Sequence, residues 1–315
     1  MPERLGPPRL EPLFERVAII GFGLIGSSIA RASRRLHLAR ALVAVDRDPA
    51  VLDRVWALDL ADEVATDAAE GVRGADLVIL CVPVGACGPV AESMRQALAP
   101  GAIVSDVGSV KGSVVAQVAP HLPEGVHFVP AHPVAGTEHS GPDAGFATLF
   151  INRWCILTPP EGTDERAIQK VREFWSAMGS NVEVMTAQHH DLVLAITSHV
   201  PHLIAYNIVG TAADLETVTQ SEVMKFSAGG FRDFTRIAAS DPTMWRDIFL
   251  HNKDAVLEML GRLNEDIAAL ARAIRWGDGD TLFNLFTRTR AIRRGIISEG
   301  QETPEPDFGR RRDNQ

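Results

Sequence analysis

A glycine-rich turn, GFGLIG at residues 21–26, has the spacing needed to hold the phosphates of a dinucleotide. In such a turn the first glycine permits the tight bend, the second lets the backbone approach the pyrophosphate, and the third lets the next helix pack against the strand. The first N–H groups of that helix face the phosphates. We expect the cofactor to be bound by Gly21, Gly23, Leu24, Ile25 and Gly26.

The flanking segments complete this pattern. Residues 17–20 form an apolar run typical of a strand buried on both faces, residues 27–36 favour a helix, and a second apolar run, 41–45, ends on Asp46. Asp46 is placed to accept hydrogen bonds from ribose hydroxyls, and its charge would repel the 2′-phosphate of NADP. The sequence therefore predicts NAD as the cofactor, with NADP less favoured, while the neighbouring Arg47 weakens that discrimination.

His132 and Ser109 are candidates for proton transfer. A neutral histidine with a pKa near 6.5 is a suitable general base at working pH. A serine hydroxyl can bind the reacting group or orient the histidine. Both residues lie in loops after predicted strands, at the edge where parallel sheets bind ligands. The alternatives are a histidine that stabilises a turn with Pro133 and a serine that caps the following helix.

Arg236, in the segment DFTR at 233–236, is the candidate for binding a carboxylate, because a guanidinium fork matches a carboxylate bidentately. The alternative is an ion pair with Asp233, three residues earlier on the same predicted helix.

His199 and His202 lie three residues apart and share a helix face. We expect substrate contact, chiefly by His202 and Ser198. Two alternatives remain open: histidines that serve the core or a cap, and a metal site that would also use His189, His190 and Asp191. No other ligand set has convincing spacing, so no metal is expected.

Strand and helix patterns alternate at βαβ spacing up to about residue 186, which predicts an α/β fold with a Rossmann-type, mainly parallel sheet. Beyond that point long helical patterns dominate, at about 187–213, 215–228, 242–274 and 278–297. The expected organisation is an N-terminal tail (1–14), a dinucleotide-binding domain (15–186), an all-α domain for substrate and dimerisation (187–298) and a disordered tail (299–315) that contains Arg310, Arg311 and Arg312.

Composition limits the partners. A formal net charge of −9 argues against nucleic acid as the main partner, and no stretch of about twenty apolar residues predicts a membrane span. Residues 1–14 lack the apolar core of a secretory signal. The negative charge leaves a small molecule as the expected substrate. The three cysteines lack metal-site spacing, and a reducing cytoplasm is the expected location.

Five segments in this order carry a resemblance: GFGLIGSS, DVGSVKG, HPVAGTEHSG, SHVPH and FRDFTRIAASDPTMWRDI. Over roughly residues 15–295 the chain resembles the prephenate/arogenate dehydrogenase family of tyrosine biosynthesis. The resemblance implies NAD(P)+-dependent oxidation with loss of CO2, giving 4-hydroxyphenylpyruvate from prephenate or tyrosine from arogenate. It also implies a dinucleotide-binding domain followed by a helical domain that forms a homodimer.

The resemblance further assigns the base to His132, a supporting hydroxyl to Ser109 and the ring carboxylate to Arg236. Thr137 and Glu138 would face the substrate side chain, and Trp245 would form a wall of the pocket. A solvated Glu138 and a core Trp245 are the alternatives. Neither prephenate nor arogenate is favoured by these residues.

Two other classes of protein share part of this pattern. A β-hydroxyacid-type dehydrogenase needs a catalytic lysine in its helical domain, and neither Lys225 nor Lys253 lies in a glycine-led lysine/asparagine motif. A non-catalytic NAD-sensing module needs the glycine turn but not His132, Ser109 and Arg236 together. The histidine-based dehydrogenase is the preferred interpretation.

Overall fold

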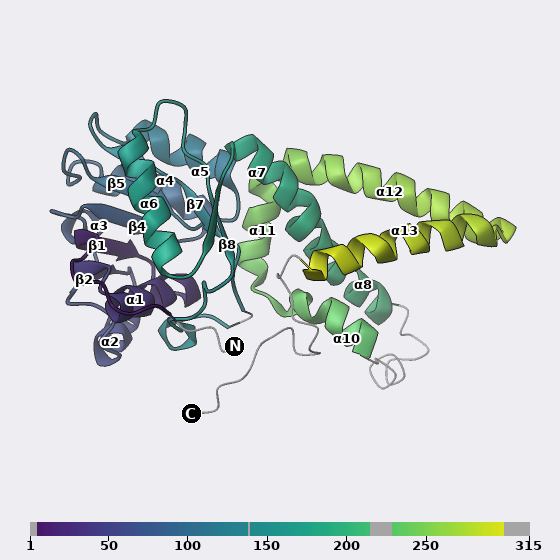
Figure 1. Cartoon of the computed structure of the whole chain (residues 1–315), viewed down its shortest axis with the longest axis horizontal. Helices are drawn as coiled ribbons and strands as arrows, with labels where there is room; N and C mark the ends of the chain where they lie inside the picture. Colours follow the sequence, from purple (N-terminus) through teal and green to yellow (C-terminus); the bar gives the residue numbers. More distant parts are fainter. Residues whose placement is uncertain (1–4, 138, 215–228, 299–315) are drawn as a thin grey trace. The chain divides into compact units, whose positions relative to one another are not determined.

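The structure is a computed structural model that describes residues 5–137, 139–214 and 229–298. Its main feature is a six-stranded sheet in the order β3-β2-β1-β4-β5-β6, in which every neighbouring pair is parallel. The strands are β1 (Phe14–Ile20), β2 (Ala39–Val45), β3 (Glu63–Ala65), β4 (Leu77–Leu80), β5 (Ile103–Asp106) and β6 (His127–Phe128). The predicted Rossmann-type parallel sheet is confirmed (Figure 1).

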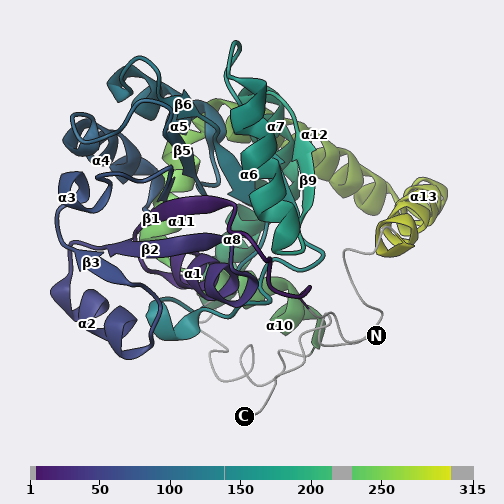
Figure 2. The ribbon, with the colours of Figure 1, turned by 60° about the vertical axis from the view of Figure 1, so that its left-hand side comes forward.

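Helices cover both faces of this sheet, as Figures 1 and 2 show. Along β1, Val17 and Ile19 face one core and Ala18 and Ile20 face the other, because successive side chains of a strand point to opposite faces. The first core contains residues of α1 (Leu24–Leu36), α2 (Pro49–Ala57) and α6 (Glu165–Ala177). The second contains residues of α4 (Cys87–Met94) and α5 (Lys111–Val118), with α3 (Ala68–Gly71) packed beside α4.

A second sheet of three strands contains β7 (Ala131–Pro133), β8 (Trp154–Leu157) and β9 (Asn181–Val184). β8, α6 and β9 continue the predicted alternation of strand and helix, but their strands lie in this second sheet and not in the main one. β7 pairs antiparallel with β8, and His132 lies opposite Ile156. The expectation that His132 lies in a loop is therefore wrong, because strand pairing fixes its backbone.

The chain after residue 186 is helical. Its elements are α7 (Ala187–Leu194), a π-helical turn (Ala195–His199), α8 (Val200–Asp214), α10 (Gly229–Thr235), a 3₁₀ turn (Arg236–Ala239), α11 (Pro242–His251), α12 (Lys253–Trp276) and α13 (Gly279–Ser298). The single helix expected over 242–274 is interrupted at Asn252, whose backbone leaves helical geometry while its buried side chain bonds to α7. The helix expected over 215–228 lies outside the described residues.

By internal packing the chain divides into two compact units, residues 1–256 and 257–315. Every described residue expected in the functional site belongs to the first unit. The change from strands to helices near residue 186 lies within that unit, so a domain boundary there stays a prediction.

The continuous helical segment Ala187–Asp214 is long and apolar enough to cross a membrane, with a mean hydropathy of 1.5 in its most apolar window. The sequence had predicted no segment of this kind. The same segment places His190, Asp191 and His199 in buried hydrogen bonds with other elements. These bonds hold the start of the segment within the site, whereas only 28% of its most apolar window is buried and Leu192, Ile196 and Ile208 are exposed.

Candidate active site

The glycine turn between β1 and α1 requires glycine at two positions. Gly21 has φ of +97°, and a Cβ there would lie 2.5 Å from the carbonyl oxygen of Cys81. A Cβ on Gly26 would lie 2.1 Å from the carbonyl oxygen of Gly21. Both distances are shorter than any real contact, so the tight turn and the close helix packing depend on these residues.

Gly23 differs because a Cβ there would meet no protein atom within 4 Å. It is the N-cap residue of α1, and among the described residues no side chain caps that helix end and no acid lies in its first turn. The first N–H groups of α1, from Leu24 onward, are thus available to an anion beside open space. These features fit the pyrophosphate of a dinucleotide.

Asp46 lies directly after β2, beside this turn. Its carboxylate oxygens accept hydrogen bonds from the backbone N–H groups of Phe22 (3.0 Å) and Asp48 (3.1 Å). The side chain is half-buried. Asp46 therefore ties the end of β2 to the glycine turn and places a negative charge where an adenosine ribose would lie.

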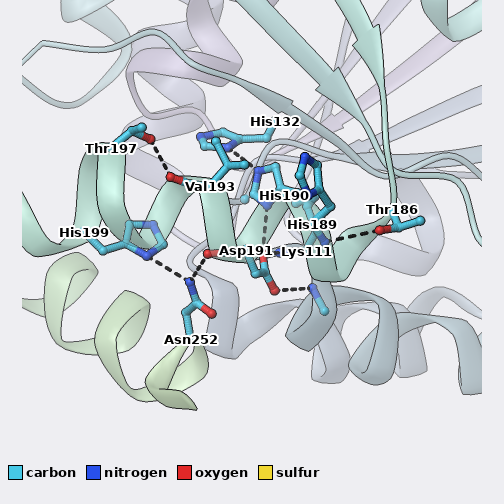
Figure 3. Close-up of polar contacts among 12 residues, drawn as sticks. Lys111, His132, Thr186, His189, His190, Asp191, Val193, Thr197, His199 and Asn252 are labelled. Atoms are coloured by element: carbon cyan, nitrogen blue, oxygen red, sulfur yellow. Dashed lines mark hydrogen bonds and ion pairs between the residues drawn. The ribbon is translucent and has the colours of Figure 1, made fainter. Parts of the chain in front are cut away.

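A chain of hydrogen bonds connects His132 to α7. His132 Nδ1 lies 2.8 Å from His190 Nε2, and His190 Nδ1 lies 2.8 Å from Asp191 Oδ1 (Figure 3). His132 is only 7% exposed and His190 is fully buried. The two rings meet edge to face, with centroids 5.0 Å apart. β7 supplies the first residue and α7 the other two.

The carboxylate of Asp191 is also bound to the start of α5. Oδ1 accepts from the backbone N–H of Lys111 (2.8 Å) and Oδ2 from that of Gly112 (2.8 Å). Among the described residues α5 has no cap from its own N-cap residue, Val110. Asp191, 80 residues further along the chain, satisfies these orphan donors instead.

A buried ion pair lies beneath this arrangement. Lys111 Nζ pairs with Asp106 at the end of β5, and it also donates to the carbonyl oxygen of Ala131 (2.6 Å), one residue before His132. Both charged side chains are 0% exposed. An isolated buried charge is very costly, so each partner holds the other in place, and β5 and β7 with them.

His199 ends the π-helical turn that follows α7 in the same helical segment. Asn252 Nδ2 donates to the carbonyl oxygen of Asp191 (2.9 Å) and to His199 Nδ1 (3.1 Å). His199, uncharged at neutral pH, then carries its proton on Nε2. Burial, the dominant cause, lowers the pKa of His199 to about 4.

The π-helical turn sets the direction of these side chains. α7 begins after Thr186, whose hydroxyl accepts from the backbone N–H of His189 (3.2 Å), and Thr197 Oγ1 donates to the carbonyl oxygen of Val193 (2.7 Å) (Figure 3). π turns are often found at functional sites. This turn directs His199 to Asn252, while His190 on the preceding turn meets His132.

His202 forms a separate contact with α11. Its ring stacks on Trp245 at a centroid distance of 3.6 Å, and Nδ1 donates to the carbonyl oxygen of Ser198 (2.8 Å). Burial lowers the pKa of His202, the bond to Ser198 opposes this, and the charge of Arg236 lowers it further. The structure therefore brings Arg236, exposed at the surface, close to His202.

Trp245 is 6% exposed and belongs to the core that also contains α4 and α5. Its ring packs against His202, His199 and Phe249, so it supports both histidine rings directly. Contact of Trp245 with substrate stays a prediction.

The remaining predicted residues are less connected. Ser109 lies half-buried in the loop after β5, and among the described residues no hydrogen bond joins its hydroxyl to His132. Thr137 is half-buried, and its hydroxyl accepts from the backbone N–H of His139 (3.3 Å). Glu138 lies outside the described residues.

Burial also sets the protonation state of His132. It lowers the pKa of His132 well below the usual value, and His190, Lys111 and His199 lower it further. The pKa of His190 is likewise lowered by burial, against the opposing effect of its bond to Asp191. At neutral pH both rings are uncharged.

No group of three or more metal-binding side chains occurs within the described parts of the chain. His190 and Asp191, which were candidates for a metal site, bond instead to His132 and to α5.

Several residues of this cluster carried little signal in the sequence. Lys111 lies in the DVGSVKG segment and His190 and Asp191 lie near His199, but their bonds join positions 58 to 80 residues apart. Asn252 had no signal at all, because it lies inside a continuous helical pattern.

The parallel sheet has a glycine turn after its first strand, and a buried, uncharged histidine lies where the sheet region meets the later helices. These features place the chain among the Rossmann-type dehydrogenases. A family model described as "Prephenate dehydrogenase, nucleotide-binding domain" matches residues 29–184. A second, "Prephenate dehydrogenase, dimerization domain", matches residues 186–288. The chain belongs to the prephenate dehydrogenase family and is an oxidoreductase.

Similar proteins agree with this assignment. The cyclohexadienyl dehydrogenase of Zymomonas mobilis is 44% identical over 93% of this chain and 99% of its own length. The prephenate dehydrogenase of Bacillus subtilis is 33% identical over 90% of this chain and 76% of its own length. The structure of Aquifex aeolicus prephenate dehydrogenase with hydroxyphenyl propionate and NAD+ superposes with a TM-score of 0.84 at 33% identity, covering 90% and 98% of the two chains. A β-hydroxyacid-type dehydrogenase is not favoured.

Proposed function

We propose that this enzyme oxidises and decarboxylates prephenate, arogenate or both with NAD+, in the biosynthesis of tyrosine. Prephenate would give 4-hydroxyphenylpyruvate, CO2 and NADH, and arogenate would give tyrosine, CO2 and NADH. The observation that carries the proposal is His132, a buried and uncharged base in a chain of the prephenate dehydrogenase family.

In this mechanism His132 accepts the proton of the ring hydroxyl. Its lowered pKa keeps it uncharged at neutral pH, which is the state that a general base needs. Ser109 follows β5 at the carboxyl edge of the main sheet, and its hydroxyl would bind the same ring oxygen.

Arg236 is the proposed partner of the ring carboxylate. A guanidinium supplies two parallel N–H donors to a carboxylate. His202, Ser198 and Trp245 would line the same region, since His202 stacks on Trp245 and lies near the charge of Arg236. Thr137 and Glu138 would face the substrate side chain.

NAD+, when bound, would supply the acceptor for the hydride of the carbinol carbon. The chain's own contribution is the glycine turn, which binds and orients the cofactor, and Asp46, whose charge opposes a 2′-phosphate. We propose NAD+ in preference to NADP+ on this ground. Loss of CO2 follows because it makes the ring aromatic.

The test is NADH formation by the purified protein with each substrate, followed by kcat/KM for both substrates with both cofactors. We expect turnover with at least one substrate and a higher kcat/KM with NAD+. Absence of NADH formation with both substrates would contradict the proposal.

We also propose that the enzyme is a homodimer that acts on a small molecule in the cytoplasm, with neither nucleic acid nor a membrane as its partner. In support of a dimer, large apolar side chains are exposed on the late helices, including Leu257, Ile267, Ile274, Trp276, Phe283 and Phe286. Exposed apolar surface of this kind marks association sites.

A further inference from the structure

The bonds between His132, His190 and Asp191 fix where each proton lies. A carboxylate only accepts hydrogen bonds, so the proton between Asp191 Oδ1 and His190 Nδ1 belongs to His190. An uncharged His190 then has a lone pair on Nε2, and this atom accepts from His132 Nδ1. The remaining nitrogen of His132, Nε2, carries a lone pair.

The opposite arrangement is unfavourable. If His132 carried its proton on Nε2 instead, His190 would need protons on both nitrogens to keep the two bonds. His190 would then be a buried cation, whereas burial lowers its pKa. The chain of bonds thus selects the tautomer of His132 that is able to act as a base through Nε2.

Asp191 is held rigidly enough to direct the other two residues. Its carboxylate accepts from two backbone N–H groups at the start of α5, and its carbonyl oxygen accepts from Asn252 of the α11–α12 junction. The start of α5 and the α11–α12 junction therefore both fix the residue at which the chain of bonds begins. Strand pairing fixes the other end, since His132 lies in β7.

We propose that His190 and Asp191 are positioning residues that orient His132 and fix its tautomer for proton abstraction at Nε2. This assignment rests on the proposed function, in which His132 is the base. The proton of the ring hydroxyl passes to His132 Nε2, and the cation so formed is stabilised through His190 by the carboxylate of Asp191. No proton needs to move beyond His132.

The electrostatic surroundings of His132 come from several elements. The titratable and charged groups around it are Lys111 of α5, Asp106 of β5, Cys155 of β8, His190 and Asp191 of α7, and His199 of the π turn. Lys111, His190 and His199 disfavour a proton on His132. Asp191, through His190, is the carboxylate linked to it by hydrogen bonds, so loss of this link should make His132 a weaker base.

Two variants test this role. His190→Phe keeps an aromatic ring without nitrogens, whereas His190→Gln keeps a side-chain oxygen that is able to accept from His132 Nδ1. In His190→Phe, Asp191 still holds its two backbone partners, so no carboxylate is left unpaired. His189→Phe is the matched control, since it makes the same change at the neighbouring, exposed position.

We expect His190→Phe to lower kcat roughly 100-fold, with little change in KM or in NAD+ affinity. The acidic limb of its kcat/KM profile should move to lower pH, because His132 loses the stabilisation of its protonated form. His190→Gln should recover most of the activity, and His189→Phe should match the wild type. An unmoved acidic limb, or a His190→Gln variant as impaired as His190→Phe, would overturn the proposal.

A spectroscopic test does not depend on activity. In wild-type protein labelled with ¹⁵N-histidine, two-bond ¹H–¹⁵N spectra distinguish the tautomers, and the His132→Asn variant identifies the relevant signals. We expect a proton on Nδ1 of His132 at neutral pH, and a proton on Nε2 would refute the assignment. If the wild type forms no NADH but shows the Nδ1 tautomer, the proposed function fails while the hydrogen-bonded geometry stands.

Discussion

Burial decides the chemistry of the histidines at the level of single residues. His132, His190 and His199 are enclosed by protein, and in each case desolvation is the main cause of a lowered pKa. A histidine kept uncharged in this way remains a base below pH 6.5. The acidic limb of kcat/KM should therefore lie below the pKa of free histidine.

The proposed role of Arg236 predicts an effect on substrate binding. Arg236→Gln should raise KM for the substrate about 10- to 100-fold, because a charge-assisted hydrogen bond contributes about 1.5–3 kcal/mol. Steady-state kinetics measure this, with Arg232→Gln as the control, since Arg232 is an exposed arginine of α10. A lower kcat at unchanged KM would contradict the carboxylate-binding role.

The negative charge of Asp46 predicts a preference for NAD+ over NADP+. Asp46→Asn keeps an oxygen that is able to accept from Phe22 N–H, but it removes the charge. We expect kcat/KM for NADP+ to rise about 10-fold relative to NAD+, roughly the effect of 1.4 kcal/mol. Asp53→Asn on the exposed face of α2 makes the same charge change and should leave the ratio of the two cofactors alone.

At the level of elements, two glycines of one turn should respond differently to the same substitution. Gly26→Ala forces a Cβ to within 2.1 Å of the carbonyl oxygen of Gly21, so thermal unfolding should occur at a clearly lower temperature. Gly23→Ala meets no protein atom, so it should fold normally and lose NAD+ affinity, measured by tryptophan fluorescence. Equal NAD+ affinity in Gly23→Ala and the wild type would place the pyrophosphate elsewhere.

The elements themselves were largely predictable. Apolar runs and glycine or proline punctuation located β1, β2, β4 and β5 and the helices between them, because buried parallel strands leave a strong pattern. The interruption at Asn252 and the separate sheet of β7, β8 and β9 were not predictable. Both depend on contacts between segments that are far apart in the sequence. The spacing of apolar residues carries no information about such contacts.

The same reason limited the prediction of the site. His132, His202 and Arg236 were identified by residue type and by resemblance, and the structure links His202 to Arg236 through charge. The roles of His190, Asp191 and Lys111 depend on the packing of α7 against α5 and of β7 beside β5. For His190 and Asp191, sequence spacing offered only a metal site as an alternative role.

At the level of the whole molecule, buried histidines make stability depend on pH. His199 has a pKa of about 4 in the folded protein and near 6.5 when unfolded, so the unfolded chain binds more protons between these values. The contribution of uncharged His199 to the free energy of unfolding should be complete above pH 6.5. It should fall as the pH drops toward 4, by up to about 3 kcal/mol. Urea unfolding at several pH values measures this, and His199→Gln should reduce the dependence.

The proposed homodimer predicts a solution mass near twice 34.1 kDa by light scattering. Phe283 and Phe286 lie on one face of α13 and are both exposed. The double substitution to Glu should shift the protein towards the monomer, whereas Trp56→Glu on α2 should not. A wild-type protein that is monomeric at micromolar concentration would refute the proposal.

The cap that Asp191 provides for α5 has a consequence for dissection of the chain. A fragment ending at residue 186 would look like a complete nucleotide-binding domain, yet it would expose two uncapped N–H groups at the start of α5. It would also uncover the core surface on which Trp245 and Ile248 pack. Such a fragment should be recovered as insoluble or partly folded protein, whereas a fragment extended to residue 256, the end of the first compact unit, keeps both the cap and the cover.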